Sequence, residues 1–236
     1  MPTLALHITC LVDQLYPEVG VATVKLLRRA GYTVEFPEAQ TCCGQPFYNS
    51  GFNAQARPLA KRNIEIFEPY DLVVLPSGSC TTMIRKEYAH LFADEPEWQS
   101  RAEALAAKTY ELTEFLAKLS PAQPRTPTTS VTYHDSCHMC RMLGLRTPPR
   151  ELLTQTGHAI VEMEESDRCC GFGGVFSVRM PEVSEAMTRA KLAEAQATGA
   201  DTLVTADPGC LMQMRRYAAE YDLTVEHIAT LLTQAK

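Results

Sequence analysis

Short apolar segments rich in β-branched residues alternate with longer stretches of helical character along the whole chain. This alternation is typical of βαβ units, in which helices connect neighbouring parallel strands. The pattern therefore predicts an α/β fold with parallel sheets. The predicted strands are 4–9, 32–36, 71–75, 131–134, 158–163 and 202–205. The predicted helices are 19–30, 53–67 and 181–198.

The second half of the chain repeats the order of elements found in the first. Each half ends in a predicted strand followed by a helix, at 110–116 and at 225–232. Between the halves, residues 120–129 contain three prolines, which cannot continue a helix and indicate a linker. We therefore expect two tandem similar βαβ-type domains, related by a pseudo-twofold axis, at 1–119 and 130–236 with this Pro-rich linker between them.

The cysteines repeat in the same order as the elements. Thirty-one residues separate Cys10 from Cys42, and thirty-one also separate Cys137 from Cys169. A single buried cysteine is most often a small hydrophobic residue, but this repeated order indicates two sets of metal ligands. The first set is Cys10, Cys42, Cys43 and Cys80, and the second set is Cys137, Cys169, Cys170 and Cys210.

Each repeated cysteine follows the end of a predicted strand, at the start of the loop that leaves the carboxyl edge of the sheet. Because parallel strands deliver these ends to the same side, each set of four sulphurs should converge where open α/β sheets build their sites. Four converging thiolates can hold zinc or an iron-sulphur cluster. The adjacent cysteines favour a cluster, since its separate metal atoms can bind neighbouring sulphurs without a tight ring. Zinc stays open as the alternative.

Glycines follow both cysteine pairs, as Gly44 in the first half and as Gly171, Gly173 and Gly174 in the second. We expect them to let the backbone approach a bulky ligand, with exposed amides that could hydrogen-bond to cluster sulphurs. The spacing of the second group does not match the dinucleotide-binding fingerprint. A nucleotide is therefore not the expected ligand.

Composition and charge exclude several function classes. The net charge is -6 and the short basic pairs never extend into a stripe, so nucleic acid is not an expected partner. No apolar run reaches the roughly 18 residues needed to cross a bilayer, and the first residues carry no mark of export. The odd number of cysteines argues against a closed disulphide framework, so we expect reduced thiols.

Four further side chains have less defined roles. His134 and His138 flank Cys137 and could bind a metal or move a proton, although a supporting or structural role is favoured. His227 is interpreted as a packed residue. Cys140 lies three residues after Cys137 and is interpreted as a spare thiol, with a fifth ligand of the second set as the alternative.

The cysteine motifs together resemble a known family. The chain is similar to the cysteine-rich domains shared by the CCG-containing polypeptide of heterodisulphide reductase and the iron-sulphur polypeptide of glycolate oxidase, and above all to the lactate utilisation protein A family. The resemblance covers essentially the whole chain. The matching segments are TCCGQP at 41–46, PSGSC at 76–80, DEPEW at 94–98, HDSC at 134–137 and CCGFGGVFSV at 169–178.

This resemblance implies an electron-transferring subunit of a cytoplasmic complex that oxidises L-lactate to pyruvate. The implied partners are two further proteins, one of which carries additional iron-sulphur clusters. The implied cofactor is one or two iron-sulphur clusters per chain, of the [4Fe-4S] type, bound by the eight repeated cysteines. A zinc-stabilised interaction module and a thiol-disulphide redox protein remain as alternatives. The latter is disfavoured because adjacent cysteines form a strained disulphide ring.

The chain departs from the fullest pattern of this family in two places. In that pattern each half ends with Cys-x-x-Cys and supports an unusual cluster with five thiolates. Here Met83 and Gln213 replace the last cysteine of each half. The resemblance therefore implies four ligands per half, and an ordinary four-iron cluster, a labile cluster or a substituted metal in place of the five-thiolate form.

Overall fold

The protein is an α/β structure built on two parallel sheets. The computed structural model describes residues 1–119, 126 and 129–234. The sheet orders are β2-β1-β3-β4 and β6-β5-β7-β8, with every pairing parallel. The first sheet contains β1 (Thr3–Leu6), β2 (Thr33–Glu35), β3 (Val73–Leu75) and β4 (Thr109–Glu111). The second contains β5 (Thr129–His134), β6 (His158–Ile160), β7 (Thr202–Thr205) and β8 (Thr224–His227).

Helices connect successive strands in both halves. The first half contains α1 (Cys10–Leu15), α2 (Pro17–Arg29), α3 (Gln45–Tyr48), α4 (Asn53–Phe67), α5 (Gly78–Thr82), α6 (Tyr88–Leu91), α7 (Pro96–Ala107) and α8 (Leu112–Leu119). The second contains α9 (Thr147–Gln155), α10 (Phe176–Arg179), α11 (Pro181–Ala197), α12 (Pro208–Arg215) and α13 (Ile228–Gln234). Two π-helical segments, η1 (Met83–Glu87) and η2 (His138–Met142), and one 3₁₀ segment, η3 (Ala218–Tyr221), complete the helices.

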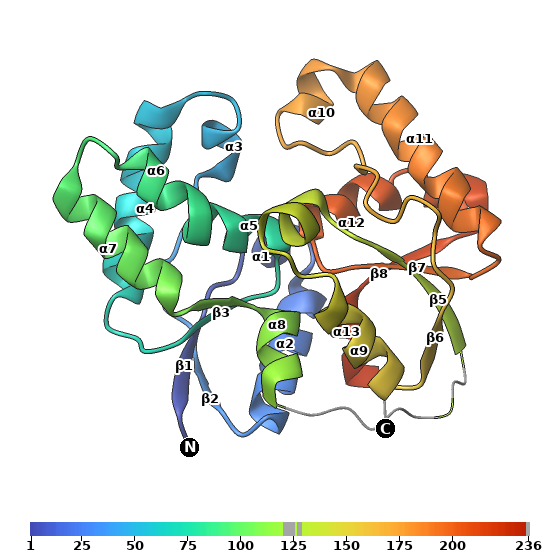
Figure 1. Cartoon of the computed structure of the whole chain (residues 1–236), viewed down its shortest axis with the longest axis horizontal. Coiled ribbons are helices and arrows are strands. Elements are labelled where there is room, and N and C mark those ends of the chain that lie inside the picture. The colour runs from blue at the N-terminus through green and yellow to red at the C-terminus, as the bar shows by residue number, and fades with distance from the viewer. Residues whose placement is uncertain (120–125, 127–128, 235–236) are drawn as a thin grey trace.

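The predicted fold class of two similar tandem α/β halves with parallel sheets is confirmed. α4 and α11 hold equivalent places between a cysteine pair and the next strand, and they lie on opposite sides of the molecule (Figure 1). The central strands β3 and β7 are short apolar runs because helices cover both faces of such sheets. The predicted linker at 120–129 lies almost entirely outside the described residues, and β5 already begins at Thr129. The domain boundary therefore stays a prediction.

The two halves share one apolar core. α2 packs against α13, and α8 packs against α9. The buried residues between them include Leu27 and Phe115 of the first half and Tyr133, Leu153 and Ile228 of the second. Full burial of such a side chain contributes about 1.5–3 kcal/mol to folding. Hydrophobic packing therefore fixes the position of one half relative to the other.

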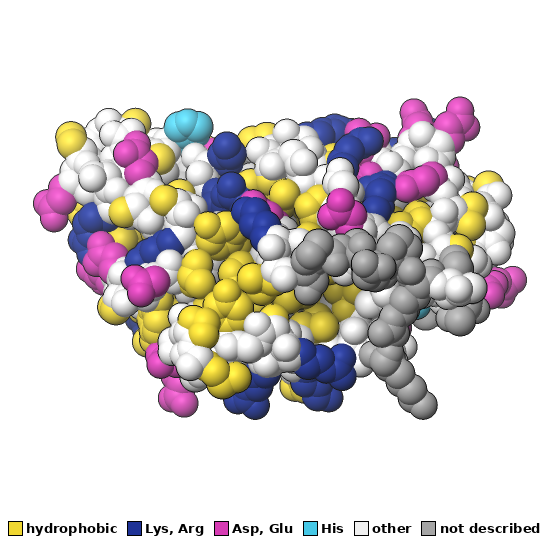
Figure 2. Space-filling view, turned by 60° about the horizontal axis from the view of Figure 1, so that its bottom comes forward, with side chains coloured by type: hydrophobic (Ala, Val, Ile, Leu, Met, Phe, Trp, Pro, Cys, Tyr) yellow, Lys and Arg dark blue, Asp and Glu magenta, His cyan; other side chains and the backbone are white. Residues whose placement is uncertain are grey.

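The surface combines apolar and charged side chains. Figure 2 shows hydrophobic side chains gathered at the centre of one face, with basic and acidic side chains scattered around them. Among the described residues, no helix combines the length and the apolar character that crossing a bilayer requires.

The Asp207 carboxylate joins the two halves at the carboxyl edges of the sheets. Oδ1 caps α12, because it accepts hydrogen bonds from the backbone N–H groups of Gly209 (3.0 Å) and Cys210 (3.3 Å). Oδ2 reaches the first half and accepts from the N–H group of Ser79 (2.7 Å) and the hydroxyl of Ser77 (3.4 Å). The two acceptor oxygens of the carboxylate thus satisfy donors on both sides.

Glu111 is a second buried carboxyl group, at the end of β4. Oε2 accepts hydrogen bonds from both the N–H group and the hydroxyl of Thr113 and from the N–H group of Glu114 (3.2 Å). Oε1 has no hydrogen-bond partner in the part of the chain that the structure describes. Burial raises the pKa of Glu111 from 4.5 to about 7. The carboxyl group thus caps α8 while it keeps its proton in mildly acidic solution.

We expect Asp207→Asn to lower the free energy of unfolding by about 1–3 kcal/mol. The amide NH₂ group would take the place of one carboxylate oxygen and would face the hydrogen-bond donors of one half, which would then lack an acceptor. Urea unfolding of the purified chain measures the change. The control is Asp201→Asn, since Asp201 is exposed at the start of β7. Equal stability of the Asp207→Asn variant and the unmodified protein would show that the carboxylate does not join the halves.

A second prediction concerns Glu111→Gln. From about pH 4.5 to 7 the unfolded chain loses this proton while the folded protein keeps it, so the unmodified protein loses up to about 3 kcal/mol of stability as pH rises. Gln cannot ionise, so this loss is absent from the variant. The free energy of unfolding of Glu111→Gln, relative to that of the unmodified protein, should therefore rise by about 2–3 kcal/mol from about pH 5 to about pH 8. Urea unfolding at both pH values tests this, with the exposed Glu103→Gln as control. Parallel pH profiles for Glu111→Gln and the unmodified protein would contradict it.

Candidate metal centre

Three of the eight repeated cysteines lie in the first turns of helices. Cys10 is the first residue of α1, and Cys80 and Cys210 are the third residues of α5 and α12. The helices of Cys80 and Cys210 begin there because Ser77 caps the N–H group of Cys80 (3.3 Å) and Asp207 caps that of Cys210 (3.3 Å). The expectation that every repeated cysteine lies at the start of a loop is therefore wrong for these three. For Cys80 and Cys210, the missed signal was the capping residue three positions before each cysteine.

The Cys-Cys-Gly sequences lie in loops, and their glycines are required by the backbone. Gly44 and Gly171 both have left-handed φ angles, of +86° and +89°. A Cβ atom on Gly171 would lie 2.4 Å from the carbonyl oxygen of Ser184 in α11. The hydroxyl of Ser184 in turn donates to the carbonyl of Gly171 (2.8 Å). The glycine thus lets the cysteine loop pack directly on the following helix.

The first set of four cysteines converges. The Sγ atoms of Cys10 and Cys42 are 3.8 Å apart, and those of Cys43 and Cys80 are 3.4 Å apart. All four line one cavity between the two halves. Each close sulphur pair joins cysteines distant in the sequence, so the first half presents a set of four and not just a vicinal pair.

The second set lines the same cavity. The Sγ atoms of Cys170 and Cys210 are 3.3 Å apart, and Sγ of Cys169 accepts a hydrogen bond from the N–H group of Gly171 (3.5 Å). Sγ of Cys137 lies 3.6 Å from Nδ1 of His138, which also lines the cavity. The sequence predicted the convergence of each set separately. The packing of the halves brings both sets to one cavity.

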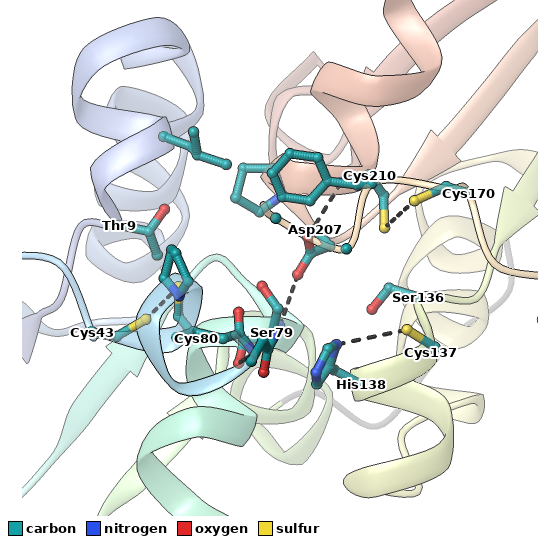
Figure 3. Close-up of a pocket in the computed structure, with 18 of the residues that line it drawn as sticks. Thr9, Cys43, Ser79, Cys80, Ser136, Cys137, His138, Cys170, Asp207 and Cys210 are labelled. Atoms are coloured by element: carbon teal, nitrogen blue, oxygen red, sulfur yellow. Dashed lines mark hydrogen bonds between the residues drawn. The ribbon is translucent and has the colours of Figure 1, made fainter. Parts of the chain in front are cut away.

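Asp207 lies between the two sets. Figure 3 shows Cys43 and Cys80 on one side of its carboxylate and Cys170 and Cys210 on the other. Because the same carboxylate binds the N–H groups of Ser79 and Cys210, it fixes the separation of the helices that carry Cys80 and Cys210.

Within each set, one cysteine is held as the thiolate. The pKa of Cys42 lies well below its usual range, because the thiols of Cys10 and Cys43 donate hydrogen bonds to it. The same interactions raise the pKa of both donors. Cys169 has the corresponding role in the second half. Metal binding would require the donor thiols to release their protons as well.

Each half also contains a buried histidine three residues before its first cysteine. Burial lowers the pKa of His7 and of His134 to about 4, so both are neutral at neutral pH. Sequence reasoning considered His134 and missed His7. The signal was the shared spacing, since His7 precedes Cys10 as His134 precedes Cys137.

Other candidates lie away from the sulphurs or pack in the core. Cys140 does not line the cavity, and burial raises its pKa. His227 is fully buried, and its Nδ1 accepts a hydrogen bond from the N–H group of Ala229 (3.2 Å). At the two positions where the fullest family pattern has cysteine, Met83 packs in the core of the first half and Gln213 donates to Ser184 Oγ (3.0 Å).

Comparison with known proteins gives the same repeat. The family of the cysteine-rich domain, CCG, matches this chain twice, over residues 4–85 and 131–215. Lactate utilization protein A of Shouchella clausii is 48% identical over 97% of this chain and 97% of the relative. Lactate utilization protein A of Bacillus subtilis is 48% identical over 97% of this chain and 98% of the relative.

The fold is also found among solved structures. The crystal structure of a hypothetical protein from Helicobacter pylori superposes with a TM-score of 0.69 over 99% of this chain, at 10% sequence identity. This chain spans 48% of the length of that structure. Taken with the two domain matches and the full-length relatives, the paired cysteine sets show that the chain belongs to the lactate utilization protein A family of CCG cysteine-rich proteins.

Proposed function

We propose that this protein is an iron-sulphur electron-transfer subunit of a complex that oxidises L-lactate to pyruvate. The family membership supports a role in lactate utilisation. The single observation that carries the electron-transfer role is the convergence of all eight repeated cysteines on one cavity. Each half would bind one cluster, of the [4Fe-4S] type, through its set of four thiolates.

The side chains present fit such a group. Cysteine thiolates are the ligands that iron-sulphur clusters take in proteins. Sulphur contacts of 3.3–3.8 Å bring six of the eight ligand atoms together in three pairs. Cys43, Cys80, Cys170 and Cys210 are at most 8% exposed, so a metal centre there would be shielded from water. When bound, a cluster supplies reversible one-electron transfer.

The protein's own residues would hold and tune these sites. The capped starts of α5 and α12 fix Cys80 and Cys210, and Asp207 fixes the distance between those helices. The N–H group of Gly171 donates to Cys169. Hydrogen bonds to ligand sulphurs and burial are the means by which proteins set cluster potentials. The common cavity supports electron exchange between the two sites.

A zinc-stabilised interaction module is the second candidate. His134, Cys170 and Cys210 have ligand atoms within 4.8 Å of one another, and a mixed set of imidazole and thiolates also suits zinc. A colourless protein with stoichiometric zinc and no redox activity would favour this candidate. Thiol-disulphide catalysis ranks lowest, because the close sulphurs form sets of four.

We also propose the setting of this activity. The complex would contain two further proteins, one with additional iron-sulphur clusters, and would work in the cytoplasm. All nine cysteines are free thiols in the structure, which suits a reducing compartment. Electrons would pass between the lactate-oxidising partner and the clusters of this chain.

Replacement of Cys43 or Cys170 by Ser tests the proposal. Each variant should lose the iron and acid-labile sulphide of its own half, because serine is a poor ligand for these clusters. Lactate-dependent electron transfer by the assembled complex should fall by at least about 10-fold. Protein purified without oxygen is analysed for iron and sulphide, and for activity with its partners.

The matched control is Cys140→Ser, since Cys140 is a buried thiol of the second half that does not line the cavity. It should keep the iron content and the activity of the unmodified protein. Full iron content and activity in both Cys43→Ser and Cys170→Ser would refute the electron-transfer role.

A further inference from the structure

The two halves differ at one pair of equivalent buried histidines. His7 follows the end of β1, and His134 is the last residue of β5, so both lie at the carboxyl ends of equivalent strands. Each stands three residues before the first cysteine of its set. Their side chains are 0% and 1% exposed. Two equivalent buried imidazoles thus accompany the two cysteine sets.

His7 has partners within its own half. Its Nε2 lies 3.3 Å from the carbonyl oxygen of Thr41, which immediately precedes Cys42. Its ring packs against the ring of Phe67, with the centroids 4.9 Å apart. Among the described residues, His7 is in no group of three side chains that could share a metal ion. Its Nδ1 has no hydrogen-bond partner among the described residues, but the contact of Nε2 holds the ring against the cysteine loop.

His134 lacks such partners. Neither of its ring nitrogens has a hydrogen-bond partner within the described part of the chain. Buried polar groups in native proteins are almost always paired, so an unpaired imidazole needs an explanation. The nearby ammonium group of Lys191 is not a hydrogen-bond partner of this ring, because it donates to the carbonyl of Glu165 and to the carboxylate of Glu194.

Two cysteine sulphurs lie close enough to the His134 ring to share a metal centre with it. A ring nitrogen of His134 and the Sγ atoms of Cys170 and Cys210 all lie within 4.8 Å of one another. The two sulphurs are themselves 3.3 Å apart. A metal centre held by these two sulphurs would therefore also be within reach of the imidazole nitrogen, since metal–nitrogen and metal–sulphur bonds are about 2.0–2.3 Å long.

We propose that His134 is a ligand of the metal centre of the second half, through one imidazole nitrogen, in place of one of the four thiolates assigned above, with Cys170 and Cys210 kept as ligands. This inference rests on the proposed function, because it requires a metal centre at the second set. The first half then binds its centre through thiolates alone. Exchange of thiolate for neutral imidazole raises the reduction potential of iron-sulphur centres. The second centre would therefore be reduced before the first.

Pulsed electron paramagnetic resonance of the reduced protein tests this ligand directly. The full chain is purified without oxygen after labelling of its histidines with ¹⁵N. The spectrum should show a nitrogen coupling of the size produced by a directly bound imidazole. His134→Asn should abolish this coupling, and any iron retained in the second half should titrate at a lower potential.

His7→Asn is the matched control, since it removes the equivalent imidazole from the first half. It should leave the nitrogen coupling unchanged. A labelled protein that contains iron and sulphide but shows no coupling, or only the weak coupling of a hydrogen-bonded imidazole, would overturn the His134 assignment and leave the electron-transfer proposal intact. Absence of iron and sulphide from the unmodified protein would overturn the proposed function. The spectrum of the unmodified protein decides the matter even if His134→Asn does not fold.

Discussion

The shared apolar core is the interaction on which the rest of the structure depends. Because α2 packs on α13 and α8 packs on α9, the carboxyl edges of both sheets face the same space. Eight sulphurs from two separate halves therefore line one cavity. The Asp207 carboxylate completes this arrangement with hydrogen bonds to both halves at that edge. Packing thus brings the two similar cysteine sets to one cavity.

The cysteine sets depend in turn on local backbone chemistry. A left-handed glycine after each vicinal pair lets the loop pack on α4 or α11. Side-chain caps start the helices that carry Cys80 and Cys210. These features are formed by groups that do not bind the metal themselves. They hold the sulphurs close together, which would lower the entropic cost of binding a metal centre.

Duplication has kept the backbone and changed the side chains around it. Ser77 and Asp207 cap equivalent helices, yet only the Asp207 carboxylate also accepts a hydrogen bond from a backbone N–H group of the other half. His7 is paired with a carbonyl oxygen, whereas its equivalent His134 faces sulphurs. Such differences give the two cysteine sets of one repeated fold unequal surroundings.

The sequence alone was sufficient for the fold class, the order of the main strands and helices, and the two sets of cysteines. Those features depend on local periodicity and on spacings that the chain repeats. Helix α4 was predicted at its observed bounds, but α5 was missed, because Gly78–Thr82 are weak helix formers that a cap at Ser77 organises. The family resemblance indicated the chemistry without showing how the sulphurs meet.

Only the tertiary structure decided how the two halves act on each other. The hydrogen bond from Ser79 to Asp207 joins residues 128 apart in the sequence, and no local pattern encodes such a contact. The same holds for the common cavity and for the unequal surroundings of His7 and His134. These features come from the packing of one half against the other, because side chains find distant partners only once the shared core has formed.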